Sequence, residues 1–253
     1  MWNAESYNRF GKERMQPSID LVSRLRGRSF KRILDAGCGT GMSTAALCDA
    51  WQHAEIIGAD LSLEMLEEAR KRLNTVTFLQ KDCGRDLSSL GTFDLIFSNA
   101  FLQWLPDQKQ FIADAFAMLR EHGVFAAQIP LFAEMPAHAC VERAERLLAE
   151  PLQGIEAEKY VLHAAPDYYN MLAAHTSRIE MWITEYCHEM DSPESILRFI
   201  QSTALRPHSE RLNAEEMQLL LTEVLHGLEQ AYPRQKNGNV LFPFKRLFLI
   251  GEK

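Results

Sequence analysis

The segment most indicative of chemistry is residues 32–41, with the sequence RILDAGCGTG. An apolar segment leads to Asp35, and glycine then occupies every second position at Gly37, Gly39 and Gly41. A strand that ends in a glycine-rich turn and opens a helix lets a polar ligand lie on backbone N–H groups. Asp35 adds a negative charge at the end of that strand, which favours a ligand with a cationic group.

Two more acids follow the next two predicted strands. Asp60 ends the second strand, where a carboxylate can accept hydrogen bonds from both hydroxyls of a ribose, or can instead cap the helix that begins near Ser62. Asp82 follows the third strand, where it can accept from an exocyclic adenine amine or stabilise the turn before Gly84. Three acids at consecutive strand ends would repel a pyrophosphate but accept S-adenosylmethionine, which carries ammonium and sulfonium charges.

The main competing ligand is a nicotinamide dinucleotide. Its fingerprint G-x-G-x-x-G needs glycine at position 42, where this chain has Met42. A metal cofactor is not expected, because the histidines and cysteines form neither an H-x-x-x-H nor a C-x-x-C pattern. We therefore predict S-adenosylmethionine as the cofactor and S-adenosylhomocysteine as its product.

The elements that must position these residues follow from the glycine and proline spacing, which predicts alternating strands and helices. Such alternation is typical of a doubly wound α/β fold, with its ligand at the carboxyl ends of the strands. The predicted strands are 31–36, 54–60, 75–80, 93–99 and 123–130, and the helices between them are 41–51, 62–73 and 106–121.

The second half of the chain has a different pattern, richer in helices. We expect a single domain over residues 1–253, with cap helices within 131–175 and 192–234 and an N-terminal lid helix at about 1–26. The elements predicted in this half are helices at 134–150, 166–175, 192–203 and 213–232, and strands at 178–189 and 240–250.

Composition excludes several classes of protein. The net charge is −7 and Lys/Arg-rich tracts are absent, which argues against nucleic acid as a partner. The apolar runs are too short to span a membrane, and the first residues have no apolar export signal. The five cysteines are odd in number, which favours a reducing compartment. We expect a cytoplasmic enzyme that is a monomer or weak homodimer.

The glycine-rich segment resembles the first motif of class I S-adenosylmethionine-dependent methyltransferases, and Asp60, Asp82 and the FSN of residues 97–99 lie where that family has its later cofactor motifs. The resemblance implies a Rossmann-like, seven-stranded, mostly parallel sheet whose last strand is antiparallel. It also implies that Asp35 and the glycine loop hold the methionine part, Asp60 the ribose, and Asp82 with the Cys83 amide the adenine. The implied cofactor site comprises Asp35, Gly37, Cys38, Gly39, Gly41, Asp60, Leu61, Asp82, Cys83 and Asn99.

Longer segments resemble one group within that family, the trans-aconitate 2-methyltransferases. They are residues 1–14, 98–107, 202–212 and 231–252, and so include the predicted cap. The resemblance implies a methyl ester formed on trans-aconitate or a related small polycarboxylate. A carboxylate is already an anionic nucleophile at neutral pH, so the reaction needs positioning and no catalytic base.

A polycarboxylate acceptor requires cationic partners, and arginine suits carboxylates best. Arg206 is our first candidate because it lies between an apolar segment and Pro207. Trp104 is expected near the transferred methyl group. Each charged candidate taken singly is more often a surface charge than a substrate ligand. The further candidates are Arg246 with Lys245, His208, Arg9 and Arg14, and the hydroxyl groups of Tyr7, Tyr168, Tyr169 and Tyr232.

Two rival functions keep the same cofactor. A malonyl-carrier-protein methyltransferase also esterifies a carboxylate and has a similar SN-x-x-x-QW segment, but its acidic carrier would need a basic docking face, which the net charge disfavours. A non-catalytic protein that binds S-adenosylmethionine would have a filled pocket where the acceptor should enter.

Overall fold

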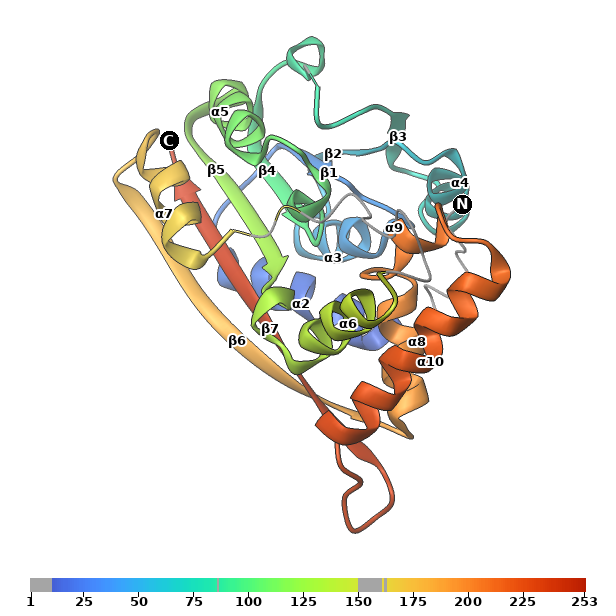
Figure 1. Ribbon diagram of the computed structural model, residues 1–253. Coiled ribbons are helices and arrows are strands. Elements are labelled where there is room, and N and C mark those ends of the chain that lie inside the picture. Colours follow the sequence, from blue (N-terminus) through green and yellow to red (C-terminus); the bar gives the residue numbers. More distant parts are fainter. Residues whose placement is uncertain (1–10, 86, 150–160, 162) are drawn as a thin grey trace.

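A seven-stranded sheet forms the centre of the protein, with the strand order β3-β2-β1-β4-β5-β7-β6 (Figure 1). The computed structural model describes residues 11–85, 87–149, 161 and 163–253. The first five strands pair in parallel, and β7 pairs antiparallel with both β5 and β6. The predicted Rossmann-like sheet with one antiparallel last strand is therefore confirmed. The strands are β1 (Arg32–Ala36), β2 (Glu55–Asp60), β3 (Thr77–Gln80), β4 (Phe93–Asn99), β5 (Leu119–Pro130), β6 (Arg178–Met190) and β7 (Val240–Glu252).

Helices cover both faces of the sheet, because its parallel strands are apolar on both sides. On one face, Leu21 and Leu47 pack with Ile33 and Leu95. On the other, Tyr168 belongs to a second cluster that also contains side chains of β1 and β4. The helices of the first face are α2 (Gly11–Arg24), α3 (Met42–Ala50) and α4 (Leu63–Arg72), and those of the second are α5 (Gln108–Met118) and α7 (Ala165–Ala173) (Figure 1).

The junction between α5 and β5 differs from its predicted boundaries. The helix ends at Met118 and the strand begins at once with Leu119, although we predicted a helix to 121 and a strand from 123. The pairing of β5 with β4 shifts register between Phe93 and Leu95, and His122 in this stretch has a φ of 60°. The LREHG segment therefore belongs to an irregular, bulged start of β5. Its polar composition alone does not distinguish such a strand start from a helix end.

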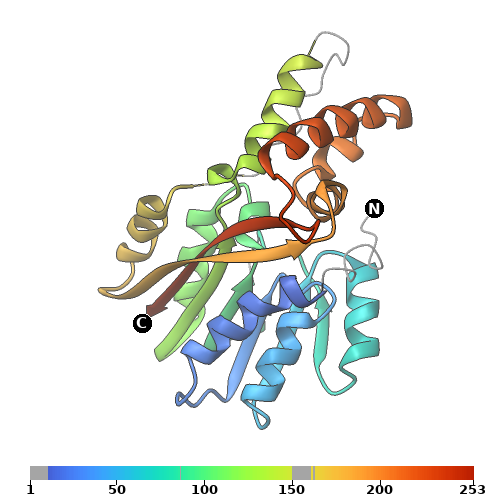
Figure 2. The ribbon, with the colours of Figure 1, turned by 90° about the horizontal axis from the view of Figure 1, so that it is seen from below.

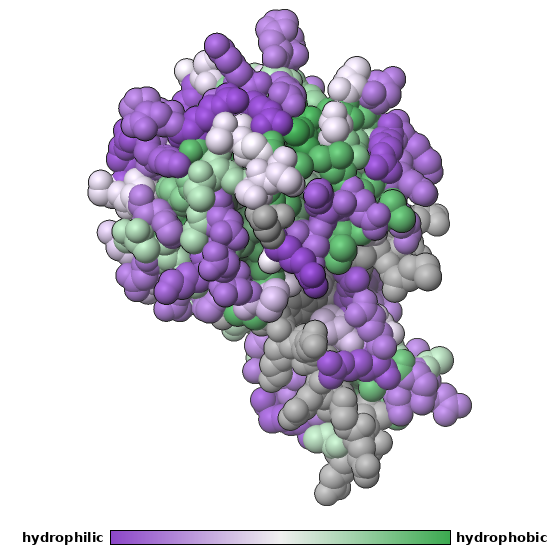
Figure 3. Space-filling model, turned by 90° about the horizontal axis from the view of Figure 1, so that it is seen from above, coloured by the Kyte–Doolittle hydropathy of each residue, from purple (hydrophilic) through white to green (hydrophobic). Residues whose placement is uncertain are grey.

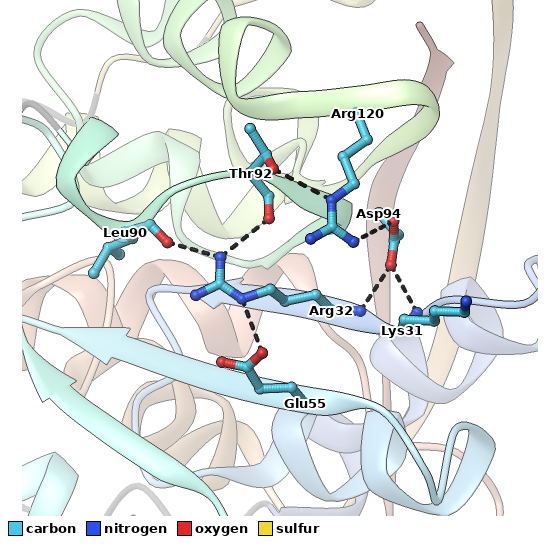
Figure 4. A network of polar contacts seen from close by, with 7 residues as sticks. All are labelled: Lys31, Arg32, Glu55, Leu90, Thr92, Asp94 and Arg120. Carbon is cyan, nitrogen blue, oxygen red and sulfur yellow. Dashed lines mark hydrogen bonds and ion pairs between the residues drawn. The ribbon is translucent and has the colours of Figure 1, made fainter.

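The amino ends of the parallel strands are tied together by a polar network around Asp94 (Figure 4). Its carboxylate accepts hydrogen bonds from the backbone N–H groups of Lys31 at 2.7 Å and Arg32 at 2.8 Å, and from Arg120 Nη1 at 2.9 Å. Burial alone would raise the pKa of Asp94, but these donors lower it below its usual value. Arg32 extends the network to Glu55 and to the carbonyls of Leu90, in η1 (Ser88–Leu90), and Thr92.

A helical cap with its own hydrophobic core stands beyond the opposite, carboxyl ends of the strands (Figure 2). The last residue of β6, Met190, and the first residues of β7, Val240 and Phe242, belong to this cap core. The two long strands therefore join the cap to the sheet. The cap elements are η3 (Phe132–Glu134), α6 (Pro136–Leu147), α8 (Pro193–Gln201), α9 (Arg206–Ser209) and α10 (Ala214–Ala231).

One predicted cap helix lies elsewhere. The segment expected at 166–175 forms α7, which packs on the sheet against α5 and β6, since Tyr168 and Leu172 are fully buried in the sheet's core. Residues 1–10 of the predicted lid, including Arg9 and Tyr7, lie outside the described residues, and the described remainder is α2.

The surface seen from above in Figure 3 is mostly hydrophilic, with hydrophobic side chains in smaller groups. Within the described residues, no helix is both long and apolar enough to cross a bilayer.

Candidate active site

The glycine loop after β1 is held close to β2 by its backbone. Gly37 N and Cys38 N both donate to the carbonyl oxygen of Ala59, at 2.8 and 3.1 Å. Gly37, Gly39 and Gly41 have φ values of 72°, 53° and 78°, a region that favours glycine. A Cβ atom at position 37 would lie 2.2 Å from the ring of Phe101, whereas one at position 39 would have no atom within 4 Å. The loop is thus packed from below at Gly37 and open at Gly39.

This contrast predicts unequal effects for two alanine substitutions. Gly37→Ala should lower the free energy of unfolding by about 3 kcal/mol, because left-handed strain adds to a clash with Phe101. Gly39→Ala should cost about 1 kcal/mol, since it adds strain alone. Urea unfolding of both variants measures the difference, and equal losses would contradict this account of the loop.

Asp35 lies beneath the loop and is completely buried. Its Oδ2 accepts hydrogen bonds from Ser43 Oγ at 2.8 Å and Thr44 Oγ1 at 2.6 Å, both in the first turn of α3. Its Oδ1 has no hydrogen-bond partner among the described residues. Burial raises the pKa of Asp35 to about 6, although the two hydroxyl groups oppose the shift. Asp35 is therefore a charge held under the loop at a cost in stability.

The raised pKa predicts an unusual pH dependence of stability. Because the folded carboxyl group binds its proton more tightly than the unfolded one, stability falls as pH rises from the unfolded pKa of 3.8 through about 6. The wild type should lose about 2 kcal/mol of unfolding free energy, measured relative to Asp35→Asn, as the pH rises from about 4.5 to about 7.5. Urea titrations at the two pH values measure it, and a constant difference would exclude a raised pKa at Asp35.

Asp60 connects the loop to the start of α4. Its Oδ2 accepts from Gly39 N and its Oδ1 from Ser62 N, each at 2.9 Å. Ser62 itself caps the helix, with its Oγ accepting from Met65 N at 3.3 Å. Burial raises the pKa of Asp60, and the backbone donors together with Arg206 act in the opposite direction. The carboxylate is thus held in one orientation at the end of β2.

Asp82 and Cys83 follow β3 in a tight turn. The Asp82 carboxylate accepts from Gly84 N at 3.0 Å and from Nε of Arg85 at 3.1 Å, and its side chain is 42% exposed. Cys83 is buried, and burial raises the pKa of its thiol to about 12. The turn chemistry that we weighed for Asp82 is present, yet its side chain still faces open space.

Asp60, Asp82, Cys83 and most of the glycine loop line one crevice of about 580 Å³ at the carboxyl ends of β1, β2, β3 and β4. Asp35 and Gly41 do not line it, because the first lies under the loop and the second against Ala69 of α4. The crevice lining also contains two arginines, Arg14 from α2 and Arg206 from α9. The other predicted cofactor residues all line the crevice: Gly37, Cys38, Gly39, Asp60, Leu61, Asp82, Cys83 and Asn99.

A smaller chamber of about 80 Å³ adjoins the crevice on the side of the cap. The two spaces share Arg14, Asn99, Ala100 and Trp104 as lining residues, so these four side chains stand at their junction. Much of the rest of the chamber wall is apolar. Its lining includes Pro130, Phe132, Phe199, Ile200, Ala204 and Phe244, together with Gln103 and Arg246.

Two buried arginines face this apolar chamber. Arg246 is 4% exposed, stacks 4.5 Å from the ring centroid of Phe244, and donates from Nη1 to Gln128 Oε1 at 3.2 Å. Arg14 is 8% exposed and lies 4.8 Å from the ring centroid of Phe199. The two rings pack edge to face with centroids 5.5 Å apart. Arg14 Nη2 also donates to the Phe199 carbonyl oxygen at 3.2 Å and to Ser202 Oγ at 2.7 Å. Stacking and hydrogen bonds therefore fix both guanidinium groups in a region of low dielectric, where an anion is attracted strongly.

The wall between the two spaces is a strained turn after β4. Ala100 has a φ of 53°, which is uncommon for alanine. Its carbonyl oxygen accepts from Gln103 Nε2 at 2.8 Å and from Trp104 Nε1 at 3.2 Å, both in or beside η2 (Leu102–Trp104). These two donors hold the turn in place, and Trp104 presents its ring to both spaces.

Several acceptor candidates lie away from the chamber. Arg206, our first candidate, lines the crevice and not the chamber. Tyr168 is fully buried in the sheet's core, where its hydroxyl donates to Gln108 Oε1 at 2.7 Å. The rest serve the cap or the surface: Lys245 pairs with Glu134, His208 with Glu145, Tyr232 accepts from Ala137 N, and Tyr169 is 52% exposed.

Sequence reasoning did not identify Gln103, Phe132, Phe199 or Phe244 as chamber residues. The apolar spacing of α8 indicates that Phe199 is buried, but periodicity does not reveal which cavity a buried side chain faces. Among the residues that the structure describes, no group of three or more His, Cys, Asp or Glu side chains could hold a metal ion.

Comparison of the sequence with known families and proteins points to methyltransferases. Residues 33–123 match a family model described as a methyltransferase domain. The chain is 36% identical over 249 residues to a trans-aconitate 2-methyltransferase of Azoarcus, covering 98% of each chain, and 36% identical over 252 residues to one of Escherichia coli, covering 100% of this chain and 98% of that one.

Among solved structures, the fold resembles the YcgJ protein of Bacillus subtilis, with a TM-score of 0.63 at 16% identity over 94% of this chain and 98% of that one. It also resembles a phosphoethanolamine N-methyltransferase of Haemonchus contortus in complex with S-adenosylhomocysteine, with a TM-score of 0.53 at 15% identity over 93% of this chain and 52% of that one. At these identities the likeness concerns the fold alone.

Proposed function

Because the chain belongs to the class I S-adenosylmethionine-dependent methyltransferases, alongside the trans-aconitate 2-methyltransferases, we propose that it forms the monomethyl ester of trans-aconitate or of a related small polycarboxylate. The cofactor of this family is S-adenosylmethionine, whose sulfonium supplies the methyl group. The proposal concerns the residues that hold this cofactor and the nature of the acceptor.

The crevice suits this cofactor in shape and charge. Gly39 leaves open space where a side chain would block a ligand, and the buried Asp35 Oδ1 supplies negative charge beneath the loop. We assign the amino-acid part of the cofactor to the glycine loop, the ribose to Asp60, and the adenine to Asp82 with the Cys83 backbone. Arg14, at the junction of crevice and chamber, suits a carboxylate of either ligand.

The acceptor is inferred from one observation, the buried guanidinium of Arg246 in an otherwise largely apolar chamber. A buried cation of this kind favours an anion, and the planar guanidinium matches a carboxylate through paired hydrogen bonds. The chamber opens beside Asn99 and Trp104, which also line the crevice, so an acceptor held there would lie next to the cofactor.

The chemistry then needs orientation more than acid–base catalysis. A carboxylate is ionised at neutral pH and attacks the methyl group in line, so no residue has to remove a proton. Arg246 and Arg14 would orient the acceptor, while Phe132, Phe199 and Phe244 exclude water from the reacting atoms.

The test is transfer of a radiolabelled methyl group to a panel of trans-aconitate, cis-aconitate, citrate and malonyl-carrier protein. We expect a base-labile ester on trans-aconitate or another small polycarboxylate. Transfer to the carrier protein alone would establish the rival methyltransferase. Binding of S-adenosylhomocysteine without transfer to any acceptor would favour a non-catalytic cofactor-binding protein.

A further inference from the structure

A contact between the cap and the sheet lies in the lining of the cofactor crevice. Arg206 opens α9, and its guanidinium carbon lies 5.5 Å from the ring centroid of Trp104, at the end of η2. Both residues line the crevice, and each comes from a different part of the fold. The pair is therefore a bridge between the cap and the loop that follows β4.

Both ends of this bridge are anchored. On the cap, Arg206 Nε donates to Glu210 Oε1 at 3.0 Å, one turn further on, and Arg206 N donates to Thr203 O at 3.0 Å. On the sheet, Trp104 Nε1 donates to the Ala100 carbonyl at 3.2 Å. Because both side chains are already held by these hydrogen bonds, they lose little conformational entropy when they stack.

The bridge also lies within electrostatic reach of Asp60. The positive charge of Arg206 is one of the influences that oppose the effect of burial on the Asp60 pKa. Asp60 ends β2 and Arg206 belongs to the cap, so the two charges line the same crevice from different parts of the fold. A nucleoside bound to Asp60 would consequently have Arg206 close by.

We propose that Arg206 and Trp104 form a latch over the cofactor crevice, which must open for S-adenosylmethionine to enter and for S-adenosylhomocysteine to leave. Arg206 is then a gating residue of the cofactor site and does not bind the acceptor. This inference rests on the cofactor of the family and is independent of which carboxylate is methylated.

A latch and an ordinary ligand contact make different kinetic predictions. Loss of a contact speeds dissociation and weakens affinity equally, whereas loss of a latch speeds association as well and changes affinity less. We expect Arg206→Ala to raise both rate constants for S-adenosylhomocysteine by about tenfold, the scale of a partly buried cation–π contact, and to change Kd by less than about threefold.

The experiment uses the whole protein and needs no turnover. Association and dissociation of tritiated S-adenosylhomocysteine are followed by rapid filtration, with excess unlabelled ligand added to start dissociation. Arg206→Lys keeps the charge but loses the planar stacking surface, so it should also speed both steps, by less than the alanine variant. Arg198→Ala removes an exposed cap arginine that is bonded to Ser195 and lies outside the crevice lining, and it should leave both rates unchanged.

A second set of variants tests Trp104, the residue on which Arg206 stacks. Arg206→Ala should raise both rates by less in the background of Trp104→Phe than in the wild type, because most of the stacked contact is then already lost. The comparison between the two backgrounds cancels the separate effect of losing the Trp104 Nε1 bond to Ala100. Unchanged rates in both Arg206 variants would overturn the proposal, and so would faster dissociation with unchanged association. Failure of methyl transfer to every polycarboxylate would overturn the proposed acceptor but leave this kinetic test intact.

Discussion

Replacing Asp60 with alanine is expected to weaken the binding of S-adenosylhomocysteine by about 100-fold. Hydrogen bonds to a charged group contribute about 1.5–3 kcal/mol, and under the proposed assignment this carboxylate accepts from two ribose hydroxyls. The substitution also removes the acceptor of Gly39 N and Ser62 N, so the glycine loop loses one of its attachments. Isothermal titration calorimetry with S-adenosylhomocysteine measures the effect directly.

The matched control is Asp82→Ala in the same crevice. Asp82 is 42% exposed and already bonded to the exposed Arg85, so solvent replaces much of what its carboxylate provides. We expect a loss of about fivefold, in line with a single solvent-screened hydrogen bond. If Asp60→Ala binds the ligand as tightly as the wild type, Asp60 does not contact the cofactor.

Replacing Arg246 with alanine is expected to reduce kcat/KM for the carboxylate acceptor by about 1000-fold. Loss of one partner from a buried, charged hydrogen-bonded pair costs about 2–5 kcal/mol. Arg246 is 4% exposed and held by Phe244 and Gln128, so water cannot take its place without disturbing the chamber. Steady-state kinetics with the best acceptor of the panel give the loss, and the Kd for S-adenosylhomocysteine should change by less than about twofold.

The neighbouring residue provides the control. Lys245 pairs with Glu134 at 3.3 Å, its side chain is 37% exposed, and it does not line the chamber. Lys245→Ala should therefore leave kcat/KM unchanged, while Arg246→Lys should recover part of the activity because the charge remains without the planar fork. Equal effects at positions 245 and 246 would show that general positive charge, and not the buried guanidinium, attracts the acceptor.

The crevice lining was largely predictable because its sequence signals are local. Gly37 to Gly41 mark a strand–turn–helix unit within a few residues, and parallel strands bring Asp35, Asp60 and Asp82 to one edge of the sheet once their ends are known. The spacing does not reveal how deeply each carboxylate is buried. Asp35 lies under the loop and outside the crevice lining because hydroxyl groups of α3 take one of its oxygens.

The chamber lining was less predictable because it depends on how the cap meets the sheet. Arg206 and Arg246 are both arginines next to apolar segments, yet Arg246 lines the chamber and Arg206 lines the crevice. The difference depends on how the cap packs on the sheet, where Phe199 of α8 contacts Phe242 and Phe244 of β7. Tyr168 illustrates the same limit. Its helix was predicted, but whether that helix joined the cap or the sheet depended on contacts with α5 and β6.

The position of β7 has a consequence for how the chain folds during synthesis. β7 lies between β5 and β6, although it is the last strand made, and its first residues complete the core of the cap. A growing chain can form the β1–β5 layer early, but β6 has no strand beside it, and Met190 and the cap helices lack Val240 and Phe242, until β7 emerges. The chamber and the cap should therefore mature together, in a late step, on a cofactor half that is already folded.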